Sequence, residues 1–377
     1  MAKPFFKRAT KTFFIICNLL LSAMFLAGAN IKYFNPQHWW FVGLLSLSLP
    51  YIILLLIIFF VIWVLTRSLW LLLPVFTIAI GWRALENIFP FNFSSSFKIA
   101  KNKNTLRIMS WNVEQFDIKE HKTHPELKKE MFDLINTYKP DIGCFQEMVG
   151  GDYNKAINYL GDFKRALDFD YYFYSYDLRF DFDNMHHFGI IIFSRLPFIN
   201  KQTITFGPPD YNSTFQYVDL LAGIDTIRIF NIHLQSLKFT RGNLQYIDDP
   251  NLRSDSTFVE SKNIVGKLKR GFLKRGIQAK KIKEEVNKSP YPAIVCGDFN
   301  DVPNSYAYAI IGMNMQNAFV KKGYGIGRTF TGISPTLRID NIFADKSFAI
   351  TQFTRINKKL SDHFPIIADV SLLKHAD

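Results

Sequence analysis

The chain has 377 residues and a formal net charge of +13, from 45 lysines and arginines against 32 aspartates and glutamates. Its mean hydropathy is +0.03, slightly above zero, although 20% of its residues are charged. A soluble globular protein with this share of charged residues would normally lie below zero, so the apolar residues must be concentrated in one region. The three cysteines, Cys17, Cys144 and Cys296, exclude a disulfide framework, because each lies inside an apolar run where cysteine acts as a small hydrophobic residue.

The apolar residues are concentrated at the N-terminus, where residues 1–90 predict a membrane domain. Three apolar runs, residues 13–29, 41–65 and 69–89, are each long enough for a membrane-spanning helix. The first run is long enough for a tilted spanning helix and has no convincing small-residue cleavage site, so an anchor is favoured over a signal peptide. The second run carries no charge, which argues against a buried helix of a soluble protein. The third is the weakest, because Arg83 and Glu86 lie in its last turns.

The orientation of these spans is predicted from the basic residues that flank them. Four lysines and arginines between positions 1 and 11 favour a cytoplasmic start. Three crossings then place the rest of the chain outside the cytoplasm, as a multi-pass protein of the cell (inner) membrane with an extracytoplasmic catalytic domain. Three lysines between positions 98 and 103 oppose this orientation, since positive charge is usually retained inside.

After a serine-containing linker at residues 91–104, strands and helices alternate through the rest of the chain, residues 105–377. Helical spacing over residues 127–138 ends at Lys139-Pro140. Apolar or alternating runs predict strands at residues 106–112, 141–147, 189–193, 226–234, 293–296, 338–343 and 366–372.

Polar residues stand at or near the ends of these strands, where stability does not require them. They are Asn112, Glu114, Glu147, Asn231, His233, Asp298, Asn300, Asp340, Asp362 and His363. Any one of them is explained by an ordinary turn. Together they predict one polar pocket at an edge of packed sheets, with a composition suited to phosphate chemistry: a carboxylate such as Glu147 suits a hard cation, and Asp298 can orient a water molecule.

The same residues carry a family resemblance. Six motifs occur in order: SWNV at 110–113, QE at 146–147, NIHL at 231–234, GDFN at 297–300, RIDNIF at 338–343 and SDHFP at 361–365. In combination they resemble the endonuclease/exonuclease/phosphatase superfamily, which has the DNase-I-like fold, over residues 106–373. The resemblance implies an α/β (α+β) fold class, a four-layer α/β/β/α sandwich of two mixed sheets. The N-terminal transmembrane helices and a long segment after His233 depart from the family pattern.

The resemblance also implies a role for each motif residue. Glu147 would bind Mg²⁺ or Mn²⁺, with Asn112 and Asp362 close to the ion. Asp298 would activate the water, aided by Asn300. His363, paired with Asp340, would contact the scissile phosphate, and His233 would be the second catalytic histidine. Glu114 and Asn231 are further candidate contacts.

The function that follows is a membrane-anchored, divalent-metal-dependent phosphoesterase that cuts phosphodiester bonds in the manner of a nuclease. Alternatives are a lipid phosphodiesterase of the sphingomyelinase type and a phosphatase of a phosphorylated sugar or lipid. A catalytically idle binding module is disfavoured, since every motif position holds a competent residue. The expected partners are a phosphate-ester substrate, either nucleic acid or phospholipid, and the bilayer; no obligate protein partner is predicted.

Two further segments have competing interpretations. The basic segment at residues 236–288 could contact nucleic acid or anionic lipid, but a solvated helix is favoured because later glutamates balance part of its charge. The aromatic segment at residues 171–188 could stack bases, but a strand with a packed loop is favoured. His186 and His187 are expected on the surface of that loop, outside the metal site.

Overall fold

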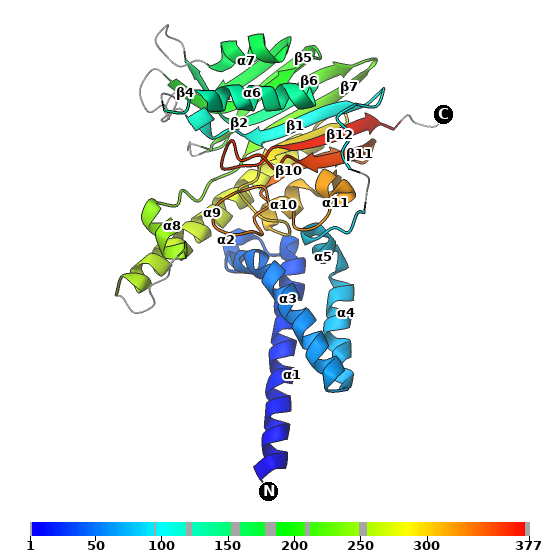
Figure 1. Cartoon of the computed structure of the whole chain (residues 1–377), viewed down its shortest axis with the longest axis vertical. Helices are drawn as coiled ribbons and strands as arrows, with labels where there is room; N and C mark the ends of the chain where they lie inside the picture. The colour runs from blue at the N-terminus through cyan, green and yellow to red at the C-terminus, as the bar shows by residue number, and fades with distance from the viewer. Residues whose placement is uncertain are drawn as a thin grey trace.

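The computed structural model describes residues 2–93, 96–117, 123–151, 159–177, 186–207, 212–248 and 255–373. Figure 1 shows a β-sandwich at one end of the molecule and a group of N-terminal helices that extends away from it. The long axis of the molecule runs along these helices, and the N-terminus lies at the far end from the sandwich.

The first sheet contains six strands in the order β11-β12-β1-β2-β4-β3. Its strands are β1 (Leu106–Asn112), β2 (Ile142–Gly151), β3 (Tyr171–Tyr176), β4 (His186–Ser194), β11 (Phe348–Arg355) and β12 (Ile366–Leu372). β1 and β2 are parallel and the other pairs are antiparallel, so the sheet is mixed. The parallel pair directs the carboxyl ends of β1 and β2 to the same edge.

The second sheet also contains six strands, in the order β5-β6-β7-β8-β10-β9. Its strands are β5 (Phe198–Thr205), β6 (Thr214–Ala222), β7 (Asp225–His233), β8 (Ala293–Asp298), β9 (Met315–Asn317) and β10 (Asp340–Asp345). Again one central pair, β7 and β8, is parallel and the other pairs are antiparallel.

Three apolar clusters hold the layers together. The inner faces of the two sheets meet in a core that includes Ile108, Cys144, Ile229 and Cys296. On the outer face of the first sheet lie α6 (Glu126–Tyr138) and α7 (Tyr159–Leu167), and on that of the second lie α9 (Asp255–Asn287) and α10 (Tyr306–Ile311). Because each sheet is apolar on both faces, both need cover from helices. The predicted four-layer sandwich is therefore confirmed.

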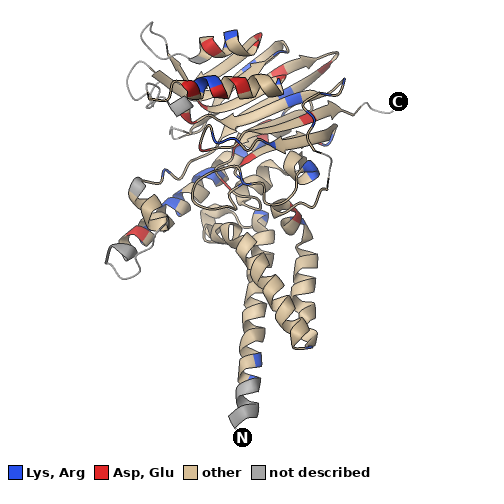
Figure 2. Ribbon diagram, in the orientation of Figure 1, with Lys and Arg blue, Asp and Glu red and all other residues tan. Residues whose placement is uncertain are grey.

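The N-terminal region forms a helical group. It contains α1 (Ala2–Ala29), a 3₁₀ turn (Ile31–Tyr33), α2 (Pro36–Trp39), α3 (Val42–Leu65), a second 3₁₀ turn (Leu69–Leu71), α4 (Leu72–Ile80) and α5 (Trp82–Ile88). Among the described residues, two helices, 8–29 and 42–65, are long and apolar enough to cross a membrane. Figure 2 shows that charged residues are sparse on the N-terminal helices and frequent on the sandwich. The predicted third span, 69–89, is a pair of helices bent by 69°, so the number of crossings is three only if this pair acts as one span.

The bend separates the apolar part of the predicted third span from its charged part. Arg83 and Glu86 both lie in α5, beyond the bend at Gly81. A Cβ atom on Gly81 would lie 2.3 Å from a ring carbon of Phe25 in α1, so this position requires glycine. The close approach brings the end of α1 against the junction of α4 and α5.

The helical group is docked on the sandwich by polar contacts as well as by packing. Arg338, which is buried, donates hydrogen bonds to the carbonyl oxygens of Asn87 and Ile88 in α5. Asn304 donates to Ala84 O (2.8 Å) and accepts from Asn87 Nδ2 (2.8 Å). The predicted linker is also held, since Asn92 Nδ2 donates to Val320 O at 2.8 Å. The two parts of the chain therefore form one packed body.

The basic segment after β7 forms α8 (Arg241–Asp248) and α9. Figure 1 shows α8 and the first part of α9 projecting to one side of the molecule. In α9 the side chains of Lys262, Lys269 and Arg270 are exposed, which agrees with the interpretation of this segment as a solvated helix. The Lys269 ammonium lies 5.3 Å from the ring centre of Trp40.

The aromatic segment differs in part from its predicted form. Residues 171–176 form β3 as predicted, whereas residues 178–185 lie outside the described part of the chain. His186 and His187 are not surface loop residues: both are buried at the start of β4, and the His187 ring stacks on Tyr176 with centres 4.3 Å apart. Apolar neighbours on both sides of the pair are consistent with its place in a strand.

A buried ion pair in the first sheet gives a stability prediction. Arg107 Nε and Nη2 donate to the two oxygens of Asp369 at 2.7 and 2.8 Å, and both side chains are almost fully buried. Asp369→Ala should destabilise the fold by about 3–5 kcal/mol, because it leaves a buried guanidinium without its counter-charge. Chemical unfolding monitored by tryptophan fluorescence measures the loss. Asp133→Ala, which removes an exposed partner of Lys129, should cost under about 0.5 kcal/mol, and equal losses for the two variants would contradict the assignment.

Candidate functional site

Strand register brings the predicted residues of the second sheet together. In the parallel pair β7 and β8, His233 lies opposite Asp298. In the antiparallel pair β8 and β10, Asp340 lies opposite the same Asp298. Three neighbouring strands therefore place a histidine and two carboxylates on one rung at the edge of the sheet, and Asp298 is in the centre.

The first sheet contributes Asn112, at the end of β1, and Glu147, one residue beyond the last position of β2 that pairs with β1. Asn112 Nδ2 lies 3.2 Å from Glu147 Oε1 and 3.2 Å from Asp298 Oδ2, so this amide joins the two sheets. Glu147 interrupts the β2–β4 register and has a φ of 54°. A bulge of this kind turns a strand residue out of the regular alternation, and here it directs the Glu147 carboxylate into the site. The strained backbone at a non-glycine residue is a common mark of functional positions.

Asp298 is fixed in place by the residues around it. Its Oδ1 accepts a hydrogen bond from the Asn300 backbone N at 2.7 Å, and its Oδ2 accepts one from Asn300 Nδ2 at 3.1 Å. Gly297 has a φ of 143°, and a Cβ atom there would lie 1.9 Å from Ile232 O. Only glycine permits this close approach of β8 to β7, and the turn that follows holds Asp298 and Asn300 in their mutual contact.

His363 and Asp340 form a hydrogen-bonded pair. His363 Nδ1 lies 2.9 Å from Asp340 Oδ2, and both side chains are buried. The other ring nitrogen, Nε2, lies 3.7 Å from Asp298 Oδ2 and 3.9 Å from Asp362 Oδ1. An imidazole held in this way by a carboxylate has a fixed orientation, and its free nitrogen points at the centre of the site.

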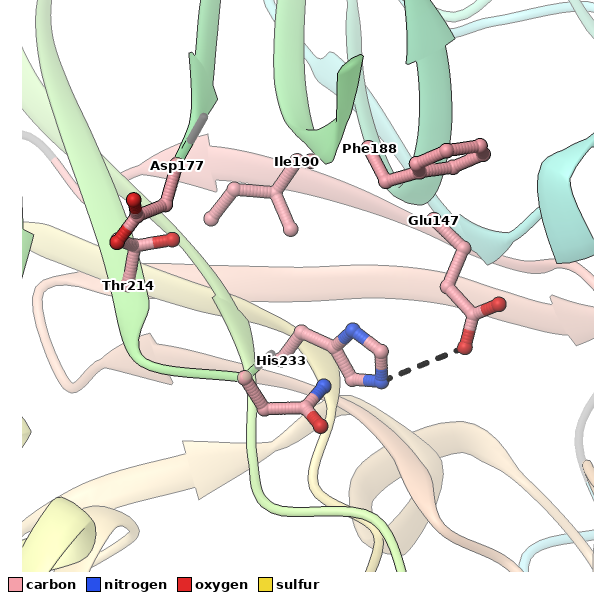
Figure 3. A pocket seen from close by; sticks show the side chains of 8 residues that line it. Glu147, Asp177, Phe188, Ile190, Thr214 and His233 are labelled. Atoms are coloured by element: carbon pink, nitrogen blue, oxygen red, sulfur yellow. Dashed lines mark ion pairs between the residues drawn. The ribbon is translucent and has the colours of Figure 1, made fainter. Parts of the chain in front are cut away.

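His233 lies on the other side of Asp298 and borders a pocket. Its Nε2 is 3.4 Å from Asp298 Oδ2 and 3.8 Å from Glu147 Oε1. Figure 3 shows the His233 ring and the Glu147 carboxylate turned toward one another, with Asp177, Thr214, Ile190 and Phe188 around the same pocket. The site thus combines a buried polar centre with a partly apolar opening.

Burial and charge act against each other on the titratable groups. For Asp298, burial raises the pKa, but the imidazoles of His363 and His233 and the Asn300 backbone N–H outweigh it, so the pKa is lowered. For both histidines burial lowers the pKa, but the carboxylates dominate and the pKa is raised. Asp298 is therefore held as an anion between two imidazoles that readily carry a proton.

The neighbourhood of Asp362 has an excess of negative charge. Burial, together with the charges of Glu114, Glu147 and Asp298, raises the pKa of Asp362 to about 7, although His363 acts in the opposite direction. Asp362 N also donates to Glu114 Oε2 at 2.8 Å, which draws the second carboxylate into the group. In the described residues, neither Glu147 nor Asp362 forms an ion pair with a lysine or an arginine. A group of carboxylates without such partners is suited to binding a cation.

A second arrangement could also hold a cation. One ligand atom each from Asp298, Asp340 and His363 lies within 4.8 Å of the others, the single such group among the described residues. This trio differs from the predicted metal residues Glu147, Asn112 and Asp362. However, the Asp340 and His363 side chains are already bonded to each other and buried, whereas Glu147 and Asp362 have side chains that are 22% and 39% exposed. A hydrated Mg²⁺ keeps several waters and suits the exposed pair better.

The structure brings together all but one of the predicted site residues. Asn112, Glu114, Glu147, His233, Asp298, Asn300, Asp340, Asp362 and His363 are connected through the contacts above. Asn231 is not part of the pocket: it is fully buried, its Nδ2 donates to Phe145 O and Ile191 O, and its Oδ1 accepts from Gln146 Nε2 at 2.7 Å. It links the two sheets two rungs deeper than His233, and so lies apart from the other predicted site residues.

Several residues of the site were not predicted. Asn212 lines the pocket, is buried, and its Nδ2 has no hydrogen-bond partner among the described residues. Thr329 Oγ1 accepts hydrogen bonds from the backbone N of Ile339 (2.9 Å) and of Asp340 (3.1 Å), and so positions the start of β10. Both come from loops, where no periodic pattern distinguishes a site residue from a turn former.

Comparisons with known proteins identify the family of this chain and the structures that share its fold. The sequence matches the Endonuclease/Exonuclease/phosphatase family over residues 109–363 and a domain of unknown function over residues 11–88. No curated protein matches the chain.

Solved structures share the fold at low sequence identity. An endonuclease/exonuclease/phosphatase from Beutenbergia cavernae superimposes with a TM-score of 0.51 at 16% identity over 72% of this chain and 72% of that one. D. rerio TDP2 complexed with single strand DNA product gives 0.51 at 16% identity, over 71% and 100%. A family protein from Leptotrichia buccalis gives 0.50 at 18% identity, over 71% and 100%. Because the family match extends across most of the chain, from β1 to His363, this protein belongs to the endonuclease/exonuclease/phosphatase family.

Proposed function

We propose that the site hydrolyses phosphodiester bonds with a divalent cation, Mg²⁺ or Mn²⁺, at the outer face of the cell membrane. The observation that carries the proposal is the position of Asp298, an anion held between His233 at 3.4 Å and His363 at 3.7 Å beside the Glu147 carboxylate. Hydrolysis of a phosphate ester requires an oriented water and donors for the phosphate oxygens, and this set of groups supplies both.

Each side chain has a role that follows from its contacts. Asp298 accepts a proton from the attacking water and orients it, since Asn300 fixes the carboxylate. His363, oriented by Asp340, and His233 donate hydrogen bonds or protons toward the phosphate. Asn112 holds Glu147 and Asp298 at a constant separation through its amide.

The cation would be held by Glu147 and Asp362, with Asn112 adjacent. When bound it neutralises phosphate oxygens and stabilises the leaving oxygen. The convergence of carboxylates that raises the pKa of Asp362 supports this location, because a cation removes the repulsion that Asp362 otherwise experiences.

A substrate screen tests the proposal. The purified full chain should hydrolyse at least one member of a panel of DNA, RNA, phospholipids and sugar phosphates when Mg²⁺ is present, and should lose that activity in excess chelator. Full activity in excess chelator would contradict metal assistance, and inactivity toward the whole panel would favour an idle binding module.

Glu147→Gln should raise the Mg²⁺ concentration needed for half-maximal activity by at least about tenfold. Loss of an outer partner of a metal ligand already costs 10–100-fold in metal affinity, and Glu147 is proposed as a direct ligand. Activity titrated against Mg²⁺ measures the shift. Glu126→Gln, an exposed substitution on α6, is the matched control and should leave the titration unchanged.

The substrate is proposed to be a nucleic acid, and a lipid phosphodiester is the second candidate. D. rerio TDP2 is a protein of this fold with a DNA product bound, but its likeness to this chain concerns the fold only. The lipid candidate is favoured by the docking of the sandwich on the apolar helices, since Arg338, two residues before Asp340, is bonded to α5. A faster reaction with vesicle lipids than with single- or double-stranded DNA would select the lipid candidate.

The orientation is testable on its own. Figure 1 places the turn between α3 and α4 on the same side as the N-terminus, and the sandwich on the opposite side. We expect a reporter that is active only outside the cytoplasm to be active when fused after Asp377. Activity of a cytoplasmic reporter alone would mean that α4 and α5 do not complete a crossing. A fusion after Arg67 should give the reverse result and serves as the control.

A further inference from the structure

A second cavity lies away from the site described above, at the junction of the apolar helices and the sandwich. It has a volume of about 590 Å³, within the range of small-molecule sites, and is bounded by the end of α1, by α5, by α10 and by α11 (Ala318–Lys322). None of its lining residues belongs to the candidate catalytic group. The phosphoesterase proposal leaves this cavity without a role.

The cavity is strongly basic. Lys32, Arg83, Lys321 and Lys346 line it, and Glu86 is the single carboxylate among its lining residues, so positive charges exceed negative ones by three. These four cations come from four separate parts of the chain: the turn after α1, α5, α11 and the turn after β10. Their convergence is a property of the tertiary structure and not of a local basic run.

The cations of this cavity are not paired with carboxylates of the described residues. Some surface lysines are, since Lys101 pairs with Asp141 and Lys281 pairs with Glu285. In the cavity, no carboxylate of the described residues forms an ion pair with Lys32, Arg83, Lys321 or Lys346. Gathering like charges without partners is unfavourable, and an anionic ligand would offset that cost.

The position of the cavity identifies the source of such an anion. Ala29 and Ile31, at the end of α1, form part of the wall, and Gly81 at the base of α5 touches Phe25 one turn earlier in α1. Apolar side chains near the ends of α1 and α4 are exposed, Met24 to 39% and Ile80 to 72%. Acyl chains along α1 and α4 would put a phosphate at the level of the basic residues.

We propose that this cavity binds the phosphate headgroup of an anionic phospholipid. The lipid joins the sandwich to the spans by contacting Lys321 and Lys346 from one side and Lys32 and Arg83 from the other. The side-chain amide of Asn314 in the wall supplies a neutral donor for the headgroup. The inference rests on the membrane insertion included in the proposed function, but not on catalysis.

Lipid retention measures the proposal directly. The full chain is reconstituted in nanodiscs of phosphatidylcholine with one-fifth phosphatidylglycerol of the same acyl chains, and the lipids that stay bound after transfer to detergent are identified by native mass spectrometry. We expect phosphatidylglycerol to be retained over phosphatidylcholine. Lys321→Ala/Lys346→Ala should reduce that preference by about tenfold or more, because each removes a charge that faces the phosphate. Glu86→Gln should increase it.

A matched variant separates a site from general attraction. Lys164→Ala/Lys280→Ala removes the same charge from exposed positions on α7 and α9 and should leave the preference unchanged. An equal loss in both double variants, or no preference in the wild type, overturns the proposal. Inorganic phosphate and glycerol phosphate in detergent form the second arm: stabilisation of the melting temperature by either, without a lipid preference, overturns the assignment to lipid.

The result does not depend on the phosphoesterase proposal. Hydrolysis of a soluble phosphodiester by Lys321→Ala/Lys346→Ala should equal that of the wild type, because the cavity shares no residue with the catalytic group. A wild-type chain that retains phosphatidylglycerol but hydrolyses no phosphodiester would contradict the proposed function alone. Release of the chain from membranes by alkaline carbonate would remove the basis of the lipid proposal and leave the catalytic one intact.

Discussion

Asp298→Asn is expected to lower turnover of a phosphodiester by about 10²–10⁴-fold while leaving the melting temperature unchanged. Losing one positioned proton-transfer group typically has an effect of this size. The substitution keeps the shape of the side chain and the oxygen that accepts from the Asn300 backbone N, so the fold is preserved. It removes the charge whose pKa the two imidazoles lower, and with it the acceptor for the proton of the water.

The measurement is turnover of one phosphodiester at saturating Mg²⁺, with thermal unfolding as the control for folding. Asp168→Asn, at a side chain that is 89% exposed, removes the same charge far from the pocket and should be neutral. Near wild-type turnover of Asp298→Asn, combined with inactivity of His186→Ala or His187→Ala, would place the site at the start of β4.

His363→Ala is expected to be at least as harmful as Asp298→Asn. The imidazole contributes a hydrogen-bond donor to the phosphate and a proton for the leaving group, and alanine removes both. Asp340→Asn should follow in milder form, because that carboxylate acts through the ring, orienting Nδ1 at 2.9 Å and raising the pKa of His363. The expected order of turnover is therefore Asp340→Asn above His363→Ala.

The leaving group distinguishes the two roles. A nitrophenyl phosphodiester needs no proton on its leaving oxygen, so it should restore much of the activity of His363→Ala and little of that of Asp298→Asn. Equal restoration of both variants would mean that His363 does not protonate the leaving group. The comparison uses kcat ratios of the nitrophenyl and alkyl esters for each variant, with the melting temperature as the folding control.

The sequence predicted many of the strands, though not β5, β6, β9 or β11, and it named most of the candidate site residues, because both are local properties. Apolar runs of strand length predicted β1, β7, β8 and β12 almost to the residue. Polar residues at the ends of apolar runs indicated a pocket, since a run buried on both faces has no structural need for Asp298 at its end or for Glu147, which lies within β2. The six motifs indicated the family, and the match over residues 109–363 confirmed it.

Register and depth could not be obtained from the sequence. Alternation puts Asn231 and His233 on the same face of β7, but only the packed sheets show that Asn231 lies two rungs deeper, bonded to Gln146 of the other sheet. The bulge that turns Glu147 into the site depends on the pairing of β2 with β4, a strand that comes later in the sequence. His186 and His187 were expected in a loop because their aromatic surroundings have no clear strand period.

The arrangement of the N-terminal helices was decided at the tertiary level as well. Composition determined that residues 8–29 and 42–65 are apolar enough to cross a membrane, since that depends only on local side chains. The bend at Gly81 depends on contact with Phe25 of another helix. The docking of α5 on Arg338 joins residues about 250 positions apart. The basic cavity likewise brings together residues that are distant in the sequence. Contacts between distant segments form only when the chain packs, because neither partner carries a local pattern that specifies the other.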